Sequence, residues 1–577
     1  MKIIKKFEIS GITGELAENI NNNWLIGLRQ TNPAILDMFA ERDIRPYRDL
    51  LPWSGEFAGK YITGAYYIYK LTYSEELYSY ILKFIDELIT YQDTDGYLGC
   101  YQKDCRLTGA FSQSPDKTGE TWDAWAHYHI MYGLMLWYEE TGKEEYINVI
   151  YRIADLFINK FYNNKPNLVS IGWAETNLAP YHMFAKLYRV TKDEKYLKFA
   201  KLIEDDLSDE RAGNYINHAL NGLEYYQCPK PRWESMHIIA GIAEMYKATG
   251  DEKYLQAVKQ IVYSILKTDI HNTGGFSTKE EAIGTPFEDG AIETCCVVAY
   301  NALVIEILDL VKDIKLIDFL ELSHYNAVMG SFSPSGHWST YDTPMDGTRN
   351  ANFHQIWFQC RSGSPELNCC SVNAPRGVGM LSEWAITNAG NYIDENILYI
   401  HFFEQCKIIT NNGVSIEIDS EYPANGNVKI RLKSENNQKI AIRIPLWSKN
   451  TTLKLNGQLI NVEAGSYAYL SKHWNDNDQI EIIFDFTVYF LHGKEKYEGK
   501  SSIYYGPLLY GCDLALNKDF DFNNLPELTL HDLQQLKPQL NNDGRITIKL
   551  PCGIILSDFY RLGCTGSEYK TWLNVIK

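Results

Sequence analysis

One pattern occurs four times in the first half of the chain, and this repeat constrains the fold more than any other feature. A Tyr-x-x-Thr segment stands at residues 69–72, 138–141, 188–191 and 246–249, at intervals of 69, 50 and 58 residues. Each copy ends an apolar stretch with helical spacing, and a short polar break and a second helical stretch follow it. Residues 304–322 resemble a weaker fifth copy. A period of about 50–60 residues predicts one helical hairpin with a long loop in each repeat.

The length of the repeating region indicates how many hairpins it holds. Six hairpins need about 300–360 residues, and residues 23–388 provide that length. We therefore predict a closed ring of six helical hairpins, an (α/α)6 barrel, over residues 23–388. An open helical solenoid is the alternative, because stacked hairpins need not close into a ring. In a closed ring, inner helix ends and long loops surround a central funnel, where functional residues are expected.

The pattern changes to short alternating stretches after about residue 390. Stretches such as VSIEIDSEY, KIAIRIPLW and QIEIIFDF alternate apolar with polar residues, and Asn, Asp and Gly breaks separate them. They predict one or two β-sandwich modules over residues 389–577. The stretch KIIKKFEIS alternates too, so the N-terminal segment, residues 1–22, can add a strand to that sandwich. The predicted fold class is therefore multidomain, with helices first and strands after them.

Charge and hydropathy exclude some partners. Lys and Arg total 55 against 73 Asp and Glu, which gives a formal net charge of −18. Without a basic tract, such a chain is a poor partner for nucleic acid or an anionic membrane. The most apolar stretch, residues 291–311, contains Glu293, Glu306 and Asp309, so we do not expect it to cross a bilayer. No apolar run of signal-peptide length follows the first residues, so a cytoplasmic location is expected. The oligomeric state stays open, a homodimer included.

Aromatic residues are abundant. They make up 13% of the chain, with 41 Tyr and 13 Trp. The CH faces of sugars stack on aromatic rings, so this excess fits a surface that handles sugars. A tyrosine-rich core explains the same composition, and the sequence does not separate the two interpretations.

The twelve cysteines fall into two groups. In a reducing compartment they are thiols, metal ligands or nucleophiles rather than disulfides. Glu293-Thr-Cys295 opens an apolar helical stretch, and Cys369-Cys370 follows about 75 residues later. These residues offer three sulfurs and one carboxylate, donors that Zn²⁺ accepts. The spacing is not that of a zinc finger, so small core residues remain the alternative. Seven other cysteines are expected to be buried core residues: Cys100, Cys105, Cys228, Cys406, Cys512, Cys552 and Cys564.

Three segments in a fixed order carry a resemblance to a known family. They are Glu293-Thr-Cys295, then Tyr325-Asn-Ala-Val328, then the CCSVNAPR segment at residues 369–376. Together they resemble the β-L-arabinofuranosidase family, glycoside hydrolase family 127. The similarity covers most of the chain, including the IRIPLW stretch at residues 442–447 in the region of strands. The resemblance implies an (α/α)6 barrel followed by β-sandwiches, and a retaining glycosidase with a zinc-bound cysteine nucleophile.

The resemblance assigns roles to the cysteines. Cys369 matches the nucleophile, and Glu293, Cys295 and Cys370 match the other zinc ligands. A free thiol has a pKa near 8.5, and zinc coordination deprotonates it. The thiolate would attack the anomeric carbon and form a thioglycosyl intermediate, which water hydrolyses with retention. The implied activity is exo-hydrolysis that releases β-L-arabinofuranose or a related plant-glycan sugar from an oligosaccharide or small glycoside.

Such a mechanism also needs one acid/base carboxyl group. The family places it in the loop between Thr-Gly-Gly and Glu-Thr-Cys, which reads TGGFSTKEEAIGTPFEDGAIETC here. This loop is a few residues shorter than the family pattern. Glu280 is the first candidate and Glu281 the second, whereas Glu288 and Asp289 are expected to be solvated loop charges.

Five further residues are candidates for sugar binding. His129 matches a substrate-binding histidine of the family, although a core or capping histidine is the alternative. Tyr341 matches a tyrosine near the nucleophile, and Asn177 stands where the family often has His. His237 is the candidate replacement for a third family histidine, and Asp123 opens the helical segment that holds His129.

Two other functional hypotheses remain. The chain could be an inactive barrel that binds oligosaccharide and has a structural zinc ion. It could also be a conventional hydrolase or lyase with two carboxylates, for which Asp123 and Glu234 are available. The intact cysteine and glutamate set, with an acidic loop before it, favours the zinc-thiolate glycosidase.

Overall fold

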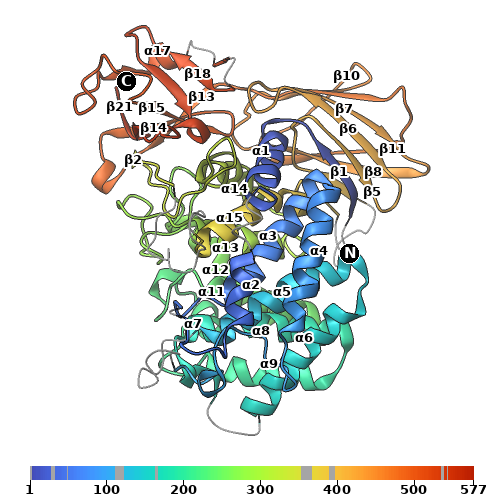
Figure 1. Cartoon of the computed structure of the whole chain (residues 1–577). Coiled ribbons are helices and arrows are strands. Elements are labelled where there is room, and N and C mark those ends of the chain that lie inside the picture. The colour runs from blue at the N-terminus through green and yellow to red at the C-terminus, as the bar shows by residue number, and fades with distance from the viewer. Residues whose placement is uncertain are drawn as a thin grey trace.

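The computed structural model describes residues 3–27, 33–48, 50–110, 122–162, 167–351, 367–388, 397–534, 538–541 and 544–576. Figure 1 shows a helical body with two regions of strands above it. The orange sheets follow the helical body in the sequence, and the red sheet holds the C-terminus. Among the described helices, none combines the length and the apolar character needed to cross a membrane.

The repeated threonine ends the inner helix of each hairpin. Its hydroxyl donates to the carbonyl four residues earlier, at 2.6–3.1 Å. The next residue takes the left-handed backbone that ends many helices. The inner helices that end this way are α3 (Glu56–Thr72), α5 (Asp123–Thr141), α8 (Pro180–Thr191) and α11 (Ser235–Thr249). The outer helices that follow are α4 (Glu75–Thr90), α6 (Glu144–Phe157), α9 (Glu194–Asp206) and α12 (Glu252–Thr268).

Two more inner helices close the ring. They are α13 (Thr294–Ile307) and α15 (Cys369–Gly379). α3 packs against α5, α5 against α8, α8 against α11, α11 against α13, and α13 against α15, which packs against α3 again. This closure excludes the open solenoid. Helix α14 (Ile314–Ser323) is the outer partner of α13, and α1 (Ile12–Ile20) lies against α3 and α15.

The sequence locates the fifth hairpin imperfectly. The predicted fifth copy began at residue 304, near the C-terminal end of its inner helix α13, whereas the helical stretch predicted to open at Glu293-Thr-Cys295 agrees with the start of α13 at Thr294. Most of α13 is buried and it is apolar on all sides, so it lacks the one-sided periodicity that marks a surface helix. Helix α5 has the same character, because every residue from Asp123 to Trp137 is buried.

Shorter helices occupy connecting segments of the barrel, and one lies in the second region of strands. Those of the barrel are α2 (Pro33–Ala40), α7 (Ala174–Asn177), α10 (Tyr215–Leu220) and α16 (Leu381–Trp384), and that of the second region of strands is α17 (Leu530–Gln534).

The first region of strands is a two-layer sandwich. Strand β1 (Ile4–Ile9) pairs antiparallel with β5 (Cys406–Thr410), so the N-terminal segment supplies an edge strand and then enters α1. The seven-stranded sheet has the order β1-β5-β6-β7-β12-β9-β10, with β6 (Ser415–Ser420), β7 (Asn427–Lys433), β12 (Gln479–Ile483), β9 (Thr452–Leu455) and β10 (Gln458–Ile460). The four-stranded sheet has the order β11-β8-β4-β3, with β11 (Ser466–His473), β8 (Asn437–Ile444), β4 (Ile397–Ile400) and β3 (Ile386–Asn388).

The second region of strands is a ten-stranded sheet. Its main path runs β16-β21-β14-β15-β19-β18-β17, and β13 and β20 pair at its side. The bounds are β13 (Val488–His492), β14 (Lys500–Tyr505), β15 (Leu508–Asp513), β16 (Leu528–Thr529), β17 (Gln539–Leu540), β18 (Ile546–Lys549), β19 (Ile555–Asp558), β20 (Glu568–Lys570) and β21 (Leu573–Ile576). Strand β2 (Gly347–Thr348), from a barrel loop, pairs with β20 and connects the two parts.

Buried polar contacts attach the barrel to both regions of strands. Arg443 of β8 is fully buried, donates to Asp318 at 2.7 Å and also pairs with Glu321. The amide of Asn326 donates to the Pro507 carbonyl at 2.9 Å and accepts from the Leu509 backbone at 2.9 Å. The family-like segment around Tyr325 therefore lies at a domain interface, in the π-helical turn η6 (His324–Val328).

Asp289 is an exposed loop charge as predicted, and it also accepts hydrogen bonds from Lys496 and Tyr497 of the second region of strands. One prediction about core residues needs correction. Of the seven cysteines expected in the core, Cys552 is exposed and Cys564 is half-buried, whereas the other five are buried. Both exceptions lie in turns near the C-terminus, where local sequence does not indicate depth.

Candidate active site and metal centre

Two neighbouring inner helices bring the four predicted ligands together at their N-terminal ends. Glu293 is the N-cap of α13, and Cys295 lies in its first turn. Cys369 and Cys370 open α15, where Asn368 and Ser371 form a capping box with bonds of 2.9 and 3.0 Å. The partial positive charge of both helix N-termini favours thiolates and carboxylates at this point.

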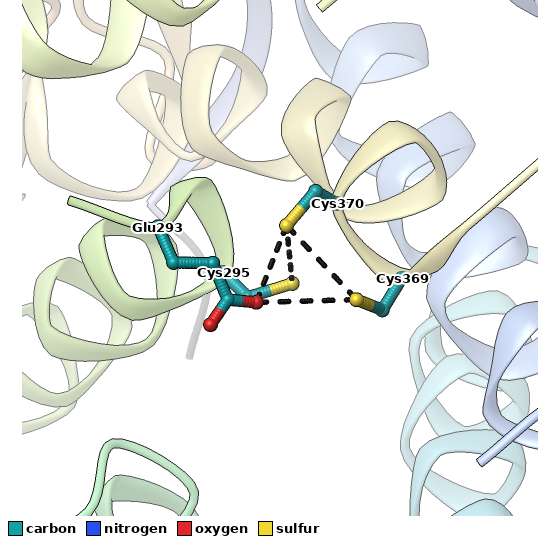
Figure 2. Close-up of side chains that lie close together, drawn as sticks. All are labelled: Glu293, Cys295, Cys369 and Cys370. Carbon is teal, nitrogen blue, oxygen red and sulfur yellow. Dashed lines mark hydrogen bonds between the residues drawn. The ribbon is translucent and has the colours of Figure 1, made fainter. Parts of the chain in front are cut away.

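The four side chains face one another, as Figure 2 shows. The Cys370 sulfur lies 3.3 Å from Oε1 of Glu293 and 3.6 Å from the Cys295 sulfur. The Cys369 sulfur lies 4.0 Å from that of Cys370 and 3.9 Å from Oε1 of Glu293. All four donor atoms lie within 4.8 Å of one another. Residues about 75 positions apart in the sequence therefore form one compact group.

Burial distinguishes the members of the group. Cys295 and Cys370 are 0% exposed and Glu293 is 1% exposed, whereas Cys369 is 7% exposed. Cys369 is thus the least buried of the four residues. The donor atoms of Glu293, Cys295 and Cys370 belong to residues that are almost fully buried.

The chemistry of the group fits a divalent metal ion. Burial raises the pKa of Glu293 and the pKa of Cys370, because a charged form is poorly solvated there. A bound cation offsets that cost, since it stabilises the deprotonated ligands. Three sulfurs and one carboxylate within 4.8 Å could therefore hold a metal ion.

A buried ion pair lies beside Glu293, Cys295, Cys369 and Cys370, which we call the metal group because they could hold a metal ion. Sequence reasoning missed this ion pair. Lys60 lies 2.9 Å from Glu56 and 3.8 Å from the Cys295 sulfur, and both charged side chains are 1% exposed. The Lys60 ammonium also lies 5.6 and 5.2 Å from the ring centroids of Trp125 and Trp233. The sequence did carry a signal for this pair. Glu56 and Lys60 are opposite charges four residues apart in the mostly apolar first half of α3, a spacing that places them side by side on one helix face.

The charge balance favours a thiolate at Cys295. Burial alone would oppose ionisation, but hydrogen bonds from Cys369 and Cys370, together with the Lys60 charge, lower the pKa of Cys295. The amide of Asn373 donates to the same sulfur over 3.4 Å.

The acidic loop places Glu280, rather than Glu281, against the predicted tyrosine. The Tyr341 hydroxyl lies 3.5 Å from Glu280, and the Tyr341 carbonyl accepts from the first amide of α13 at 2.8 Å. Arg232 pairs with the other oxygen of Glu280 at 2.6 Å. Glu281 lies 3.8 Å from Arg232 and is more exposed, at 48% against 32% for Glu280. Between the two candidates, Glu280 is therefore the carboxyl that is held in place.

A second carboxyl group, that of Glu234, shares Arg232 with Glu280. Glu234 is fully buried and accepts two hydrogen bonds from Arg232, at 2.8 and 3.1 Å. Burial raises the pKa of Glu234 to about 7, although the Arg232 charge opposes the change. Arg232 links the two carboxyl groups, and sequence reasoning did not single it out.

Two of the predicted sugar-binding residues have buried polar atoms without partners among the described residues. Nε2 of His129 accepts or donates no hydrogen bond there, and neither amide atom of Asn177 does. Such atoms are rare in native proteins and usually contact water or a ligand. Trp125 packs edge-on to His129 at 4.4 Å and to His237 at 4.9 Å, so the two histidines share one aromatic wall.

The structure gives Asp123 a different position from the one expected for a sugar-binding or catalytic carboxylate. Its oxygens accept from the Tyr97 hydroxyl at 3.1 Å and from the Leu107 amide at 2.8 Å. Asp123 therefore anchors a loop to the first turn of α5. Asp123 is thus unavailable as the partner of Glu234 in a catalytic carboxylate pair, since both of its oxygens accept hydrogen bonds from the scaffold.

Comparison with known proteins identifies the family. A model for the catalytic domain of the GH127 β-L-arabinofuranosidases matches residues 27–383. The chain belongs to this family. The model for the GH127 middle domain matches residues 397–486, which hold most of the sandwich. The protein is thus a glycoside hydrolase, and the resemblance carried by the cysteine and glutamate motifs is confirmed.

Individual GH127 proteins are similar over most of their length. A non-reducing end β-L-arabinofuranosidase from Bifidobacterium longum subsp. longum is 22% identical over 486 residues, covering 75% of this chain and 71% of its own. The structure of a GH127 β-arabinofuranosidase has a TM-score of 0.79 at 19% identity, covering 100% of this chain and 98% of its own. The GH127 β-L-arabinofuranosidase of Geobacillus stearothermophilus T6 has a TM-score of 0.78 at 17% identity, covering 99% and 100%. These likenesses confirm the predicted (α/α)6 barrel followed by β-sandwich modules.

Proposed function

We propose that this GH127 member is a retaining exo-β-L-arabinofuranosidase with Cys369 as its nucleophile. The observation that carries the proposal is the buried group of Glu293, Cys295, Cys369 and Cys370, of which Cys369 is the most exposed. The family and the names of its similar members support the sugar and the exo mode. A retaining glycosidase needs a nucleophile that forms a covalent bond to the sugar, and Cys369 is proposed for that role.

The same four residues are proposed as ligands of a zinc ion. Their types and number match a tetrahedral zinc site, in which sulfur and carboxylate donors are common. Bound zinc would supply positive charge that keeps the thiols deprotonated near neutral pH.

Cys369 performs the first step. Its thiolate attacks the anomeric carbon, a sulfur–carbon bond forms, and the bond from that carbon to the leaving-group oxygen breaks. Glu280 gives its carboxyl proton to the departing oxygen. Arg232 and Tyr341 hold the Glu280 carboxyl group in position for this transfer.

Glu280 also assists the second step. As a carboxylate it takes a proton from a water molecule, whose oxygen attacks the anomeric carbon and displaces the Cys369 sulfur. Two displacements at one carbon restore its configuration, so the sugar leaves with retention. His129, Asn177 and His237 are proposed to bind sugar hydroxyls, since His129 and Asn177 have buried polar atoms that need partners.

Metal analysis together with a substrate panel tests the proposal. Purified protein should contain about one zinc ion per chain and should hydrolyse p-nitrophenyl β-L-arabinofuranoside in preference to α-L-arabinofuranosides and pyranosides. Cys370→Ala should lose zinc and activity together. Full activity in metal-free protein would contradict the zinc-thiolate mechanism. A zinc-loaded protein that hydrolyses no glycoside would contradict the catalytic function.

A further inference from the structure

Three tryptophans form a continuous stripe at the barrel mouth that carries the metal group. The ring centroids of Trp53 and Trp122 lie 5.4 Å apart, and those of Trp122 and Trp173 lie 5.7 Å apart. Trp173 is 42% exposed, and the other two rings are half-buried. They come from three segments: a loop before α3, the N-cap of α5 and the N-cap of α7. Single exposed apolar residues are ordinary, but a contiguous aromatic group marks a binding surface.

The middle ring of this tryptophan stripe, Trp122, is continuous with the aromatic wall beside the predicted sugar-binding histidines. Trp122 packs against Trp125 at 6.4 Å, and Trp125 contacts both predicted sugar-binding histidines. The backbone amide of Trp122 donates to the Pro52 carbonyl at 3.0 Å, which fixes the loop that holds Trp53. The positions of Trp53 and Trp122 are therefore fixed by contacts with the barrel helices and their loops.

One end of the stripe, Trp173, reaches the acid/base side. The Arg232 guanidinium lies 5.1 Å from the Trp173 ring centroid, and the same guanidinium pairs with Glu280 at 2.6 Å. In a retaining glycosidase the acid/base group stands beside the leaving-group oxygen, and the nucleophile lies on the opposite face of the sugar. Trp173 therefore lies on the acid/base side, where the leaving group of a bound glycoside would extend.

The geometry points to a platform for the leaving group: we propose that Trp53, Trp122 and Trp173 stack against the sugar ring to which the released unit is attached. Sugars present flat CH faces that pack on aromatic rings, and tryptophan supplies the largest rigid apolar area with few rotamers to fix. This inference rests on the proposed function and narrows it. The preferred substrate has a sugar as its leaving group, as at the end of an oligosaccharide, rather than a small alcohol.

Two substrates that share the released unit test the platform. One is the methyl β-L-arabinofuranoside, and the other is a disaccharide with β-L-arabinofuranose at its non-reducing end. Wild-type protein should prefer the disaccharide in kcat/KM. Trp173→Ala should lower kcat/KM for the disaccharide by about tenfold or more, mainly through KM, because a stacking contact is lost. The same variant should lose much less on the methyl glycoside, because that substrate has no leaving-group ring to stack.

Matched variants separate stacking from general damage. Trp173→Phe should recover most of the preference for the disaccharide, since a smaller ring still stacks. Tyr469→Ala, which removes a 53% exposed aromatic ring from strand β11 of the sandwich, should change neither substrate.

Three outcomes would overturn the inference, each for a different reason. Equal losses on both substrates would show that Trp173 acts only by supporting Arg232 and Glu280. Unchanged kinetics in both Trp173→Ala and Trp53→Ala would show that no sugar stacks there. Wild-type protein that hydrolyses neither substrate would overturn the proposed function itself, and the platform with it.

Discussion

The buried ion pair of Lys60 and Glu56, which lies beside Cys295, offers a test of how much buried charges contribute to the free energy of unfolding. The two side chains are 1% exposed and 2.9 Å apart, and Glu56 also accepts a hydrogen bond from Trp125. Lys60→Met retains most of the apolar stem and removes the charge. The carboxyl group of Glu56 is then left buried without its cation.

The expected cost is large because burial already disfavours that carboxylate. Removing one partner of a buried ion pair typically costs about 3–5 kcal/mol. Burial raises the pKa of Glu56 to about 7, although Lys60 opposes the change, so the loss of Lys60 should raise that pKa further. A group whose folded pKa exceeds its unfolded value stabilises the fold at low pH, and that stability is lost as pH rises through the folded pKa. Lys60→Met should therefore be more destabilised near pH 8 than near pH 6.

Urea unfolding, followed by tryptophan fluorescence at both pH values, measures the effect in a double-mutant cycle. Glu56→Gln combined with Lys60→Met should recover about 2 kcal/mol or more relative to the sum of the single variants. The pair of Lys143 with Asp86 is the matched control. Its atoms lie 3.0 Å apart, but its side chains are 36% and 50% exposed. Changing it to Met and Asn should cost no more than about 1 kcal/mol.

Two results would refute this reasoning. The first is additivity of the two single variants, which would mean that Lys60 and Glu56 do not interact energetically. The second is equal destabilisation of Lys60→Met at both pH values, which would mean that Glu56 takes up no proton when its partner is removed.

Three other predictions follow from single residues. Cys369→Ser should keep zinc, by metal analysis, but lose several orders of magnitude in kcat, because a serine hydroxyl is a poor nucleophile; near wild-type turnover would contradict the thiolate mechanism. Glu280→Gln should slow glycosides with poor leaving groups about 10²–10⁴-fold and activated aryl glycosides less, and equal slowing of both would argue against a general acid. Burial lowers the pKa of His324 from 6.5 to about 3, so its contribution to stability is complete above pH 6.5 and is lost as pH falls towards 3. His324→Gln should therefore reduce the loss of stability between pH 7 and pH 5 by about 2 kcal/mol, and an unchanged pH dependence of the melting temperature would contradict the assignment.

The sequence predicted the elements whose causes are local. The threonine of each repeat marks a hairpin corner because helix ends are set by capping and by a left-handed residue within a few positions. The order of motifs around Glu293, Cys295 and Cys369 identified the family. It also indicated the four side chains that the structure brings together as a candidate metal site, since thiols and a carboxylate are an unusual donor set. Alternation of apolar and polar residues in stretches such as β7 predicted the sandwich.

The tertiary structure decided what depends on contacts across the ring. Closure of α15 on α3 brings Lys60 to Cys295, although 235 residues separate them. Arg232, Glu280 and Trp173 likewise come from three separate loops. No local pattern encodes such meetings, because periodicity and capping act over a few residues, whereas these distances follow from how whole helices pack. For the same reason Asp123 proved to be an anchor rather than a sugar-binding carboxylate. The sequence specified which chemical groups the chain has, and the packing of the six inner helices decided which of them meet.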